Sequence, residues 1–184
     1  VGAAGIAVRS VAPHLVSKAR DPAVVVVDEL GRFAVPILSG HLGGANDLAR
    51  EIAGLLGGQA VLTTATDARG IFAFDQWARR LGCAIPDPEK IRPVASRMLA
   101  GGTAAFWSQW PVAGECPSGV VPAGQEAAQV QLTIRDTPEP ALKLVPRIVW
   151  AGIGCRRGVP AERLEAALRS GLEAAGLHPA ALAG

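Results

Sequence analysis

A run of four valines, Val24–Val27, constrains the fold of this 184-residue chain more than any other feature of its sequence. β-Branched residues favour extended backbone, and a run that is apolar on both faces is typical of a strand covered on both sides. We therefore expect a central strand at residues 23–27. A second strand is predicted at residues 33–38, where Pro36 favours an edge position or an early end because proline lacks the amide hydrogen that a sheet ladder needs.

A glycine-rich loop, SGHLGG at residues 39–44, joins the second strand to an amphipathic helix. Asn46 or a neighbour is expected to cap the start of this helix, and Gly57-Gly58 ends it. Its expected apolar face consists of Ala45, Leu48, Ala49, Ile52, Leu55 and Leu56. A further strand at residues 60–64 completes the order strand, loop, helix, strand, which predicts a crossover connection in an α/β sheet. The expected fold class is therefore α/β, with small mixed or parallel sheets flanked by helices in two to three subdomains.

The remainder of the chain alternates helices and strands. The expected helices lie at residues 72–81, 88–100 and 160–175, and the expected strands lie at 103–107, 130–134 and 147–153. Residues 136–140 (DTPEP) are the predicted linker. The predicted domains are a partial amino-terminal α/β domain at 1–70, a middle domain at 71–143 and the start of a carboxyl-terminal α/β domain at 144–184.

Composition and charge exclude several classes of protein. The net charge is only +2 and the basic residues are not clustered, so nucleic-acid binding is not expected. No apolar run approaches the roughly 18 residues that a membrane span needs. Cys83, Cys116 and Cys155 form no C-x-x-C pair, which argues against a zinc site and a disulfide framework and favours a reducing cytoplasm. Because Met98 is the only methionine, we interpret the sequence as an excerpt of a longer chain.

The loop at residues 39–46 is the first candidate site. Its glycines allow the backbone to approach a ligand closely, and the helix behind it offers amide hydrogens to an anion. We expect His41 to act as a general base beside an oxyanion site made by the amides around Gly43, Gly44 and Ala45. The alternative is a tight turn in which His41 satisfies a local carbonyl. The loop has neither the lysine of a P-loop nor the glycine spacing of a dinucleotide fold, which argues against a generic phosphate- or nucleotide-binding domain.

Two further segments carry polar side chains at the ends of predicted strands. Residues 63–67 (TTATD) offer hydroxyls and a carboxylate that can bind polar substituents or orient water, although a Ser/Thr or Asx turn is the alternative. Residues 152–158 (GIGCRRG) again join a strand to a helix, and Arg156 can bind a carboxylate there. Cys155 is interpreted as a non-catalytic thiol, because no histidine is near it in the sequence.

The segment from Asp21 to Asp67, which contains SGHLGGAN and TTATD, resembles the amino-terminal domain of the cobalt-precorrin-5A hydrolase (CbiG) family of anaerobic cobalamin biosynthesis. GIGCRRG resembles the opening of the carboxyl-terminal domain of that family, and the two motifs occur in the family's order. The resemblance implies a hydrolase that opens the δ-lactone of cobalt-precorrin-5A and releases acetaldehyde to give cobalt-precorrin-5B. Full-length members extend further on both sides, so the resemblance also implies a fragment truncated at both ends.

The same resemblance sets the expected ligands and partners. The substrate is a corrinoid intermediate, and no separate cofactor or metal site is expected because the substrate carries the cobalt. Other cobalamin-pathway enzymes are candidate partners, and the expected location is the cytoplasm. The alternative is a non-catalytic corrinoid-binding or assembly partner of the same pathway.

Residue chemistry gives the hypotheses for the site of such a hydrolase. His41 is the candidate base, with axial ligation of the substrate's cobalt as a competing role. Asp67 is expected to orient either water or His41. The candidates for substrate binding are Ser39, Gly40, Gly43, Gly44, Asn46, Thr64, Thr66, Gly154 and Arg156.

Overall fold

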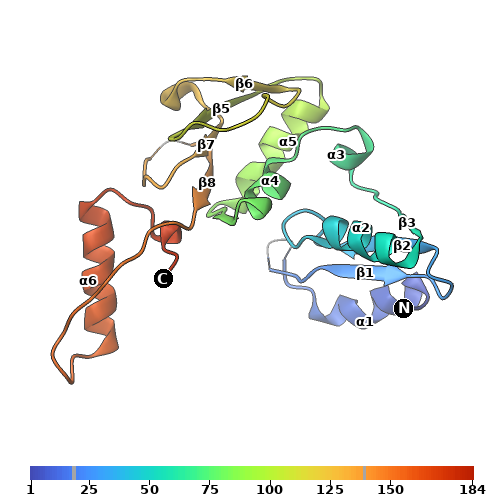
Figure 1. Ribbon diagram of the computed structural model, residues 1–184, viewed down its shortest axis with the longest axis horizontal. Helices are drawn as coiled ribbons and strands as arrows, with labels where there is room; N and C mark the ends of the chain where they lie inside the picture. The colour runs from blue at the N-terminus through green and yellow to red at the C-terminus, as the bar shows by residue number, and fades with distance from the viewer. Residues whose placement is uncertain (18–19, 139) are drawn as a thin grey trace. The chain divides into compact units, whose positions relative to one another are not determined.

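A computed structural model describes residues 1–17, 20–138 and 140–184 (Figure 1). Internal contacts divide the chain into two compact units, Val1–Arg79 and Arg80–Gly184, and each is described by itself. Glu139 of the predicted linker lies outside the described residues. The division into three domains at 1–70, 71–143 and 144–184 stays a prediction.

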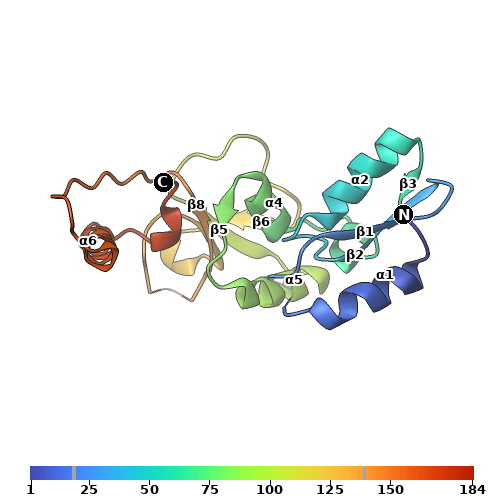
Figure 2. The same ribbon diagram turned by 90° about the horizontal axis from the view of Figure 1, so that it is seen from below.

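The first unit contains a three-stranded mixed sheet in the order β1-β2-β3. β1 (Val24–Val27) pairs antiparallel with β2 (Phe33–Leu38), and β2 pairs parallel with β3 (Gln59–Ala60). Helix α2 (Ala45–Leu56) connects β2 to β3 and packs on one face of the sheet, while Figures 1 and 2 show α1 (Ala4–Val11) toward the other face. The remaining helices of this unit are η1 (Ala12–His14), α3 (Ala65–Ala68) and α4 (Phe74–Arg80). Mixed sheets flanked by helices confirm the α/β fold class.

The valine run forms a strand, but the prediction that it is the central strand is wrong. β1 lies at the edge of the sheet, and β2, which contains Pro36, lies in the centre. Proline is tolerated there because β3 pairs only with Phe33 and Ala34. The β1–β2 register also shifts next to Val25, the residue opposite Pro36, so the ladder is already interrupted at that point.

Small side chains fill the contact between α2 and its sheet. Ala49 and Ala53 pack with Val27 and Ala34 in the core of this unit. Leu55 and Leu56 of the predicted apolar face are instead 80% and 54% exposed. The residues of α2 that are buried are Ala45, Asn46, Ala49 and Ala53. The helix therefore turns an amide side chain, that of Asn46, inward at its first turn.

The second unit contains a five-stranded sheet in the order β4-β8-β7-β5-β6. Its strands are β4 (Cys83–Ala84), β5 (Ala104–Ser108), β6 (Val120–Pro122), β7 (Val130–Leu132) and β8 (Leu142–Pro146). β8, β7, β5 and β6 pair in parallel, and β4 is antiparallel to β8. The helices are η2 (Pro88–Lys90), α5 (Ile91–Leu99), η3 (Gln125–Ala127), α6 (Ala161–Ala174) and η4 (Pro179–Ala181).

The predicted strand at residues 147–153 is wrong. This segment makes only an isolated bridge between Val149 and Leu182, and it continues as an exposed stretch without regular structure up to Pro160. Among the described residues, no helix is both long and apolar enough to cross a membrane.

Candidate functional site

The loop between β2 and α2 is closed by its own backbone hydrogen bonds. The carbonyl oxygens of Ser39, Gly40 and His41 accept from the amides of Ala45, Asn46 and Gly44 at 3.1, 2.9 and 3.0 Å. The Ser39 hydroxyl donates to the carbonyl oxygen of Asp21 at 2.6 Å. The amides of Gly44 and Ala45 are therefore already occupied, and the predicted oxyanion site does not hold for these two groups.

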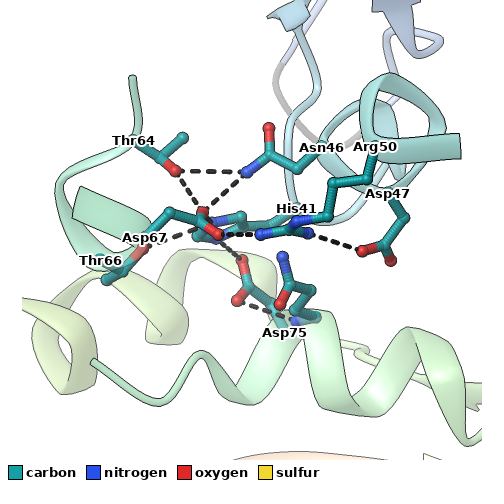
Figure 3. A network of polar contacts seen from close by, with 9 residues as sticks. His41, Asn46, Asp47, Arg50, Thr64, Thr66, Asp67 and Asp75 are labelled. Atoms are coloured by element: carbon teal, nitrogen blue, oxygen red, sulfur yellow. Dashed lines mark hydrogen bonds and ion pairs between the residues drawn. The ribbon is translucent and has the colours of Figure 1, made fainter. Parts of the chain in front are cut away.

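The closed loop presents His41 to two carboxylates (Figure 3). Nε2 of His41 lies 2.8 Å from Oδ2 of Asp67, which belongs to α3. Nδ1 lies 3.2 Å from Oδ2 of Asp75, which belongs to α4. The three side chains are 12%, 11% and 5% exposed, in the order His41, Asp67, Asp75. The imidazole is thus held at both ends and still has an opening to solvent.

Asp67 is the most heavily hydrogen-bonded group of the site. Its Oδ2 accepts from His41, from the Thr64 hydroxyl and from Nδ2 of Asn46, the last at 2.8 Å. Its Oδ1 accepts from Nη2 of Arg50 at 2.7 Å. Burial opposes ionisation of this carboxyl, but the hydrogen bonds from Thr64, His41 and Arg50 outweigh burial and lower its pKa to about 2. Asp67 is therefore a carboxylate throughout the neutral range.

The same contacts favour the protonated form of His41. The hydrogen bond to Asp75 raises the pKa of the imidazole, burial opposes this, and the charges of Asp75 and Asp67 add to the increase. Only an imidazolium can donate from both ring nitrogens to two carboxylates, because a neutral ring would turn a lone pair toward one of them. In this form the ring has no lone pair for cobalt or for a proton from water.

Three more charged residues surround this centre. Arg50 joins Asp67 to Asp47 through its Nη1, which lies 2.9 Å from Oδ1 of Asp47, and Asp47 also forms an ion pair with Arg79. With His41 protonated, these three residues and the three of the centre together carry three positive charges, on His41, Arg50 and Arg79, and three negative charges, on the three aspartates. The guanidinium groups of Arg50 and Arg79 lie at the solvent side, where these side chains are 42% and 36% exposed.

The structure brings together five of the residues expected at the site. These are His41, Asn46, Thr64, Thr66 and Asp67, with the Thr66 hydroxyl 3.3 Å from Nε2 of His41. Ser39, Gly40, Gly43 and Gly44 shape the loop that carries the histidine. Gly154 and Arg156 belong to the exposed segment of the second unit, as does the exposed Cys155, and the roles of Gly154 and Arg156 stay predictions.

Sequence reasoning missed Asp47, Arg50, Asp75 and Arg79. A signal for Arg50 was present, because it follows Asn46 by four residues and shares its face of the helix. The only signal for Asp75 was its place as a carboxylate next to the aromatic residue Phe74 and two residues before Trp77.

Gly40 is required by the position of Asn46. A Cβ at residue 40 would lie 2.7 Å from Oδ1 of Asn46, a side chain with 0% exposure. We expect Gly40→Ala to reduce the free energy of unfolding by about 1–3 kcal/mol, because the amide cannot move without leaving Asp67. The matched control is Gly54→Ala in α2, where no heavy atom lies within 4 Å and helix propensity predicts a gain of about 0.5–1 kcal/mol. Urea denaturation measures both, and equal stability of Gly40→Ala and wild type would contradict the packing argument.

Within residues 1–17, 20–138 and 140–184, no three His, Cys, Asp or Glu side chains are grouped so that they could hold a metal ion. The expectation that the protein needs no cofactor of its own is untested and remains a prediction.

Comparison with known proteins places this α/β unit and its histidine loop in the class of cobalamin-biosynthesis proteins. Residues 1–67 match a family model described as "Cobalamin synthesis G N-terminal", and the match ends on Asp67. The chain is 40% identical over 197 aligned positions to a protein named "Cobalt-precorrin-5A hydrolase" from Salmonella typhimurium and 31% identical to one of the same name from Priestia megaterium. These alignments cover 99% and 91% of the chain. These matches confirm the resemblance to the cobalamin synthesis G (CbiG) family that the two motifs predicted.

The chain spans 56% and 50% of the length of those two relatives. It is also similar to the crystal structure of a cobalamin biosynthesis protein G homologue from Sulfolobus solfataricus, with 24% identity and a TM-score of 0.49. That comparison covers 99% of this chain and 55% of the other.

Proposed function

We propose that this chain forms part of a hydrolase acting on cobalt-precorrin-5A, and that the site around His41 and Asp67 opens the δ-lactone of this corrinoid. The observation that carries the proposal is the 40% identity, over nearly the whole chain, to a protein named cobalt-precorrin-5A hydrolase. The partly buried histidine, with both ring nitrogens hydrogen-bonded, supports it, because such arrangements are typical of sites that transfer protons.

Lactone opening sets a clear requirement for proton transfer. Water adds to the carbonyl carbon, the ring C–O bond breaks, and the departing oxygen receives a proton. In our proposal the His41 imidazolium donates this proton, and the neutral imidazole then accepts the proton that the attacking water loses. We assign His41 as a donor first, instead of the base expected from the sequence, because both of its nitrogens contact carboxylates. The two-carbon fragment leaves afterwards as acetaldehyde, giving cobalt-precorrin-5B.

The proposed function also implies the cofactor requirement, the partners and the location of the protein. The corrinoid brings its own cobalt, so the protein supplies residues and no cofactor. Other enzymes of cobalamin biosynthesis are the expected partners, and the expected location is the cytoplasm. Thr64, Thr66 and Asn46 serve the polar substituents of the substrate, or hold Asp67 where His41 needs it.

Incubation of the chain with cobalt-precorrin-5A, with acetaldehyde measured over time, tests the function. Release of acetaldehyde above the rate without protein is the expected result. Tight corrinoid binding without any release would reject the hydrolase for this chain and support the alternative, a corrinoid-binding or assembly partner.

A further inference from the structure

Asp75 is a buried carboxylate that neither the sequence motifs nor the family match include, since the matched residues end at position 67. The residue is 3% exposed and lies in the first turn of α4. Its Oδ1 accepts from the backbone amide of Gln76 at 3.0 Å, and its Oδ2 lies 3.2 Å from Nδ1 of His41. One oxygen therefore fixes the carboxylate to its own helix, and the other oxygen faces the imidazole.

The two carboxylates that contact His41, Asp67 and Asp75, differ in their other hydrogen-bond partners. Asp67 is shared among four donors, among them the charged Arg50, so its negative charge is already largely balanced without the histidine. The described contacts of Asp75 are with the His41 ring and with the backbone amide of Gln76, and neither contact involves an arginine or a lysine. We infer that Asp75 is a positioning residue of the proposed reaction, which orients the His41 ring through Nδ1 and holds it in the doubly protonated form.

Two carboxylates face the His41 ring directly. Asp67 faces His41 from α3, and Asp75 faces it from α4. Asp47 and Arg50 of α2 and Arg79 of α4 form the outer part of the network, and the described ion pairs connect them to the ring through Asp67. Removing the charge at residue 75 thus removes one of two direct anionic neighbours and leaves the outer ion pairs in place.

The test is the titration of His41 followed by NMR of its ring nitrogens in the free protein, with His41→Gln used to assign the signal. In the wild type we expect both nitrogens to carry hydrogen at pH 7. In Asp75→Asn the titration midpoint is expected to fall by about one pH unit or more, because an opposite charge at this distance favours the charged ring by that amount. Asp75→Glu should restore most of the shift, and Glu51→Gln, an exposed change on α2, should leave the midpoint within about 0.3 units.

A neutral His41 at pH 7 in the wild type overturns the inference even if Asp75→Asn does not fold, and so does an unchanged midpoint in a folded Asp75→Asn. The kinetic prediction rests on the proposed function, in which the imidazolium is the active form. As the pH rises, the rate of acetaldehyde release should begin to fall at a lower pH in Asp75→Asn than in the wild type, and the displacement should equal that of the titration midpoint. The titration needs no substrate, so a chain that releases no acetaldehyde would reject the function and leave the assignment of Asp75 to the NMR result.

Discussion

Replacement of His41 with alanine is expected to reduce acetaldehyde release from cobalt-precorrin-5A by about 100-fold or more. General acid–base groups typically contribute factors of 10² to 10⁴, and His41 is the one side chain of the network that can both give and take a proton near neutral pH. Asp67 cannot replace it, because a carboxyl whose pKa is lowered to about 2 is a weak base.

The matched control for His41→Ala is His14→Ala. His14 is exposed in η1 and makes none of the contacts described for the site, so turnover should stay within about twofold of the wild type. The substrate dissociation constant of each variant, measured by the absorbance of the corrinoid, separates loss of binding from loss of chemistry. Turnover of His41→Ala within about tenfold of wild type, a barrier change of about 1.4 kcal/mol, would reject His41 as the proton-transfer group.

The part of the fold that local chemistry controls could be predicted from the sequence. The carboxyl end of α2 was predicted at Gly57-Gly58, and Gly57 follows the helix with left-handed backbone at φ 67°. Asn46, a candidate for the amino-terminal cap, lies within the helix instead, and the cap position is Gly44. The hypothesis that Asp67 orients His41 requires a contact, and that contact is present at 2.8 Å. The loop that carries His41 and the segment that carries Asp67 each follow a strand of the same crossover unit. The order of these elements along the chain was therefore enough to predict that both lie at the same edge of the sheet.

The order of the strands in the sheets and the position of β8 could not be predicted from the sequence. A valine run indicates a strand but not its neighbours, so nothing in Val24–Val27 distinguished the edge position from the centre. β8 was not predicted, because Lys143 interrupts its apolar pattern. This lysine is 6% exposed and donates to the carbonyl oxygen of Thr137, a compensation that only the folded chain provides.

The candidate site predicted from the sequence lacked Asp75, because its contact with His41 exists only in the folded chain. Asp75 lies 34 residues from His41 along the chain and on a different helix. No spacing rule connects these two positions. The missing carboxylate changes the chemistry, because one acidic neighbour is compatible with a neutral base, while two favour an imidazolium.

Asp67→Ala is expected to produce the largest loss of stability in the first unit. The change leaves the buried Nδ2 of Asn46, the Thr64 hydroxyl and Nε2 of His41 without their shared acceptor. Removing the shared partner of a partly buried charged network costs about 2 kcal/mol or more, which urea denaturation at pH 7 would measure. The control is Glu165→Ala on α6, whose ion pair with Arg169 is exposed at 68% and 69% and should contribute less than about 0.5 kcal/mol.

The dependence of this loss on pH identifies its cause. The pKa of Asp67 is lowered from its ordinary value of 3.8 to about 2, so its contribution to stability is complete above 3.8 and is lost as the pH falls toward 2. Asp75 and, to a smaller extent, Asp67 also raise the pKa of His41 above its ordinary value of 6.5, a contribution that is complete only below that pH, so the stability difference between wild type and Asp67→Ala should be constant from about pH 6 to about pH 4 and shrink below that. A loss under about 1 kcal/mol at pH 7, or a difference that stays unchanged at pH 2.5, would mean that the carboxylate charge does not hold this network together.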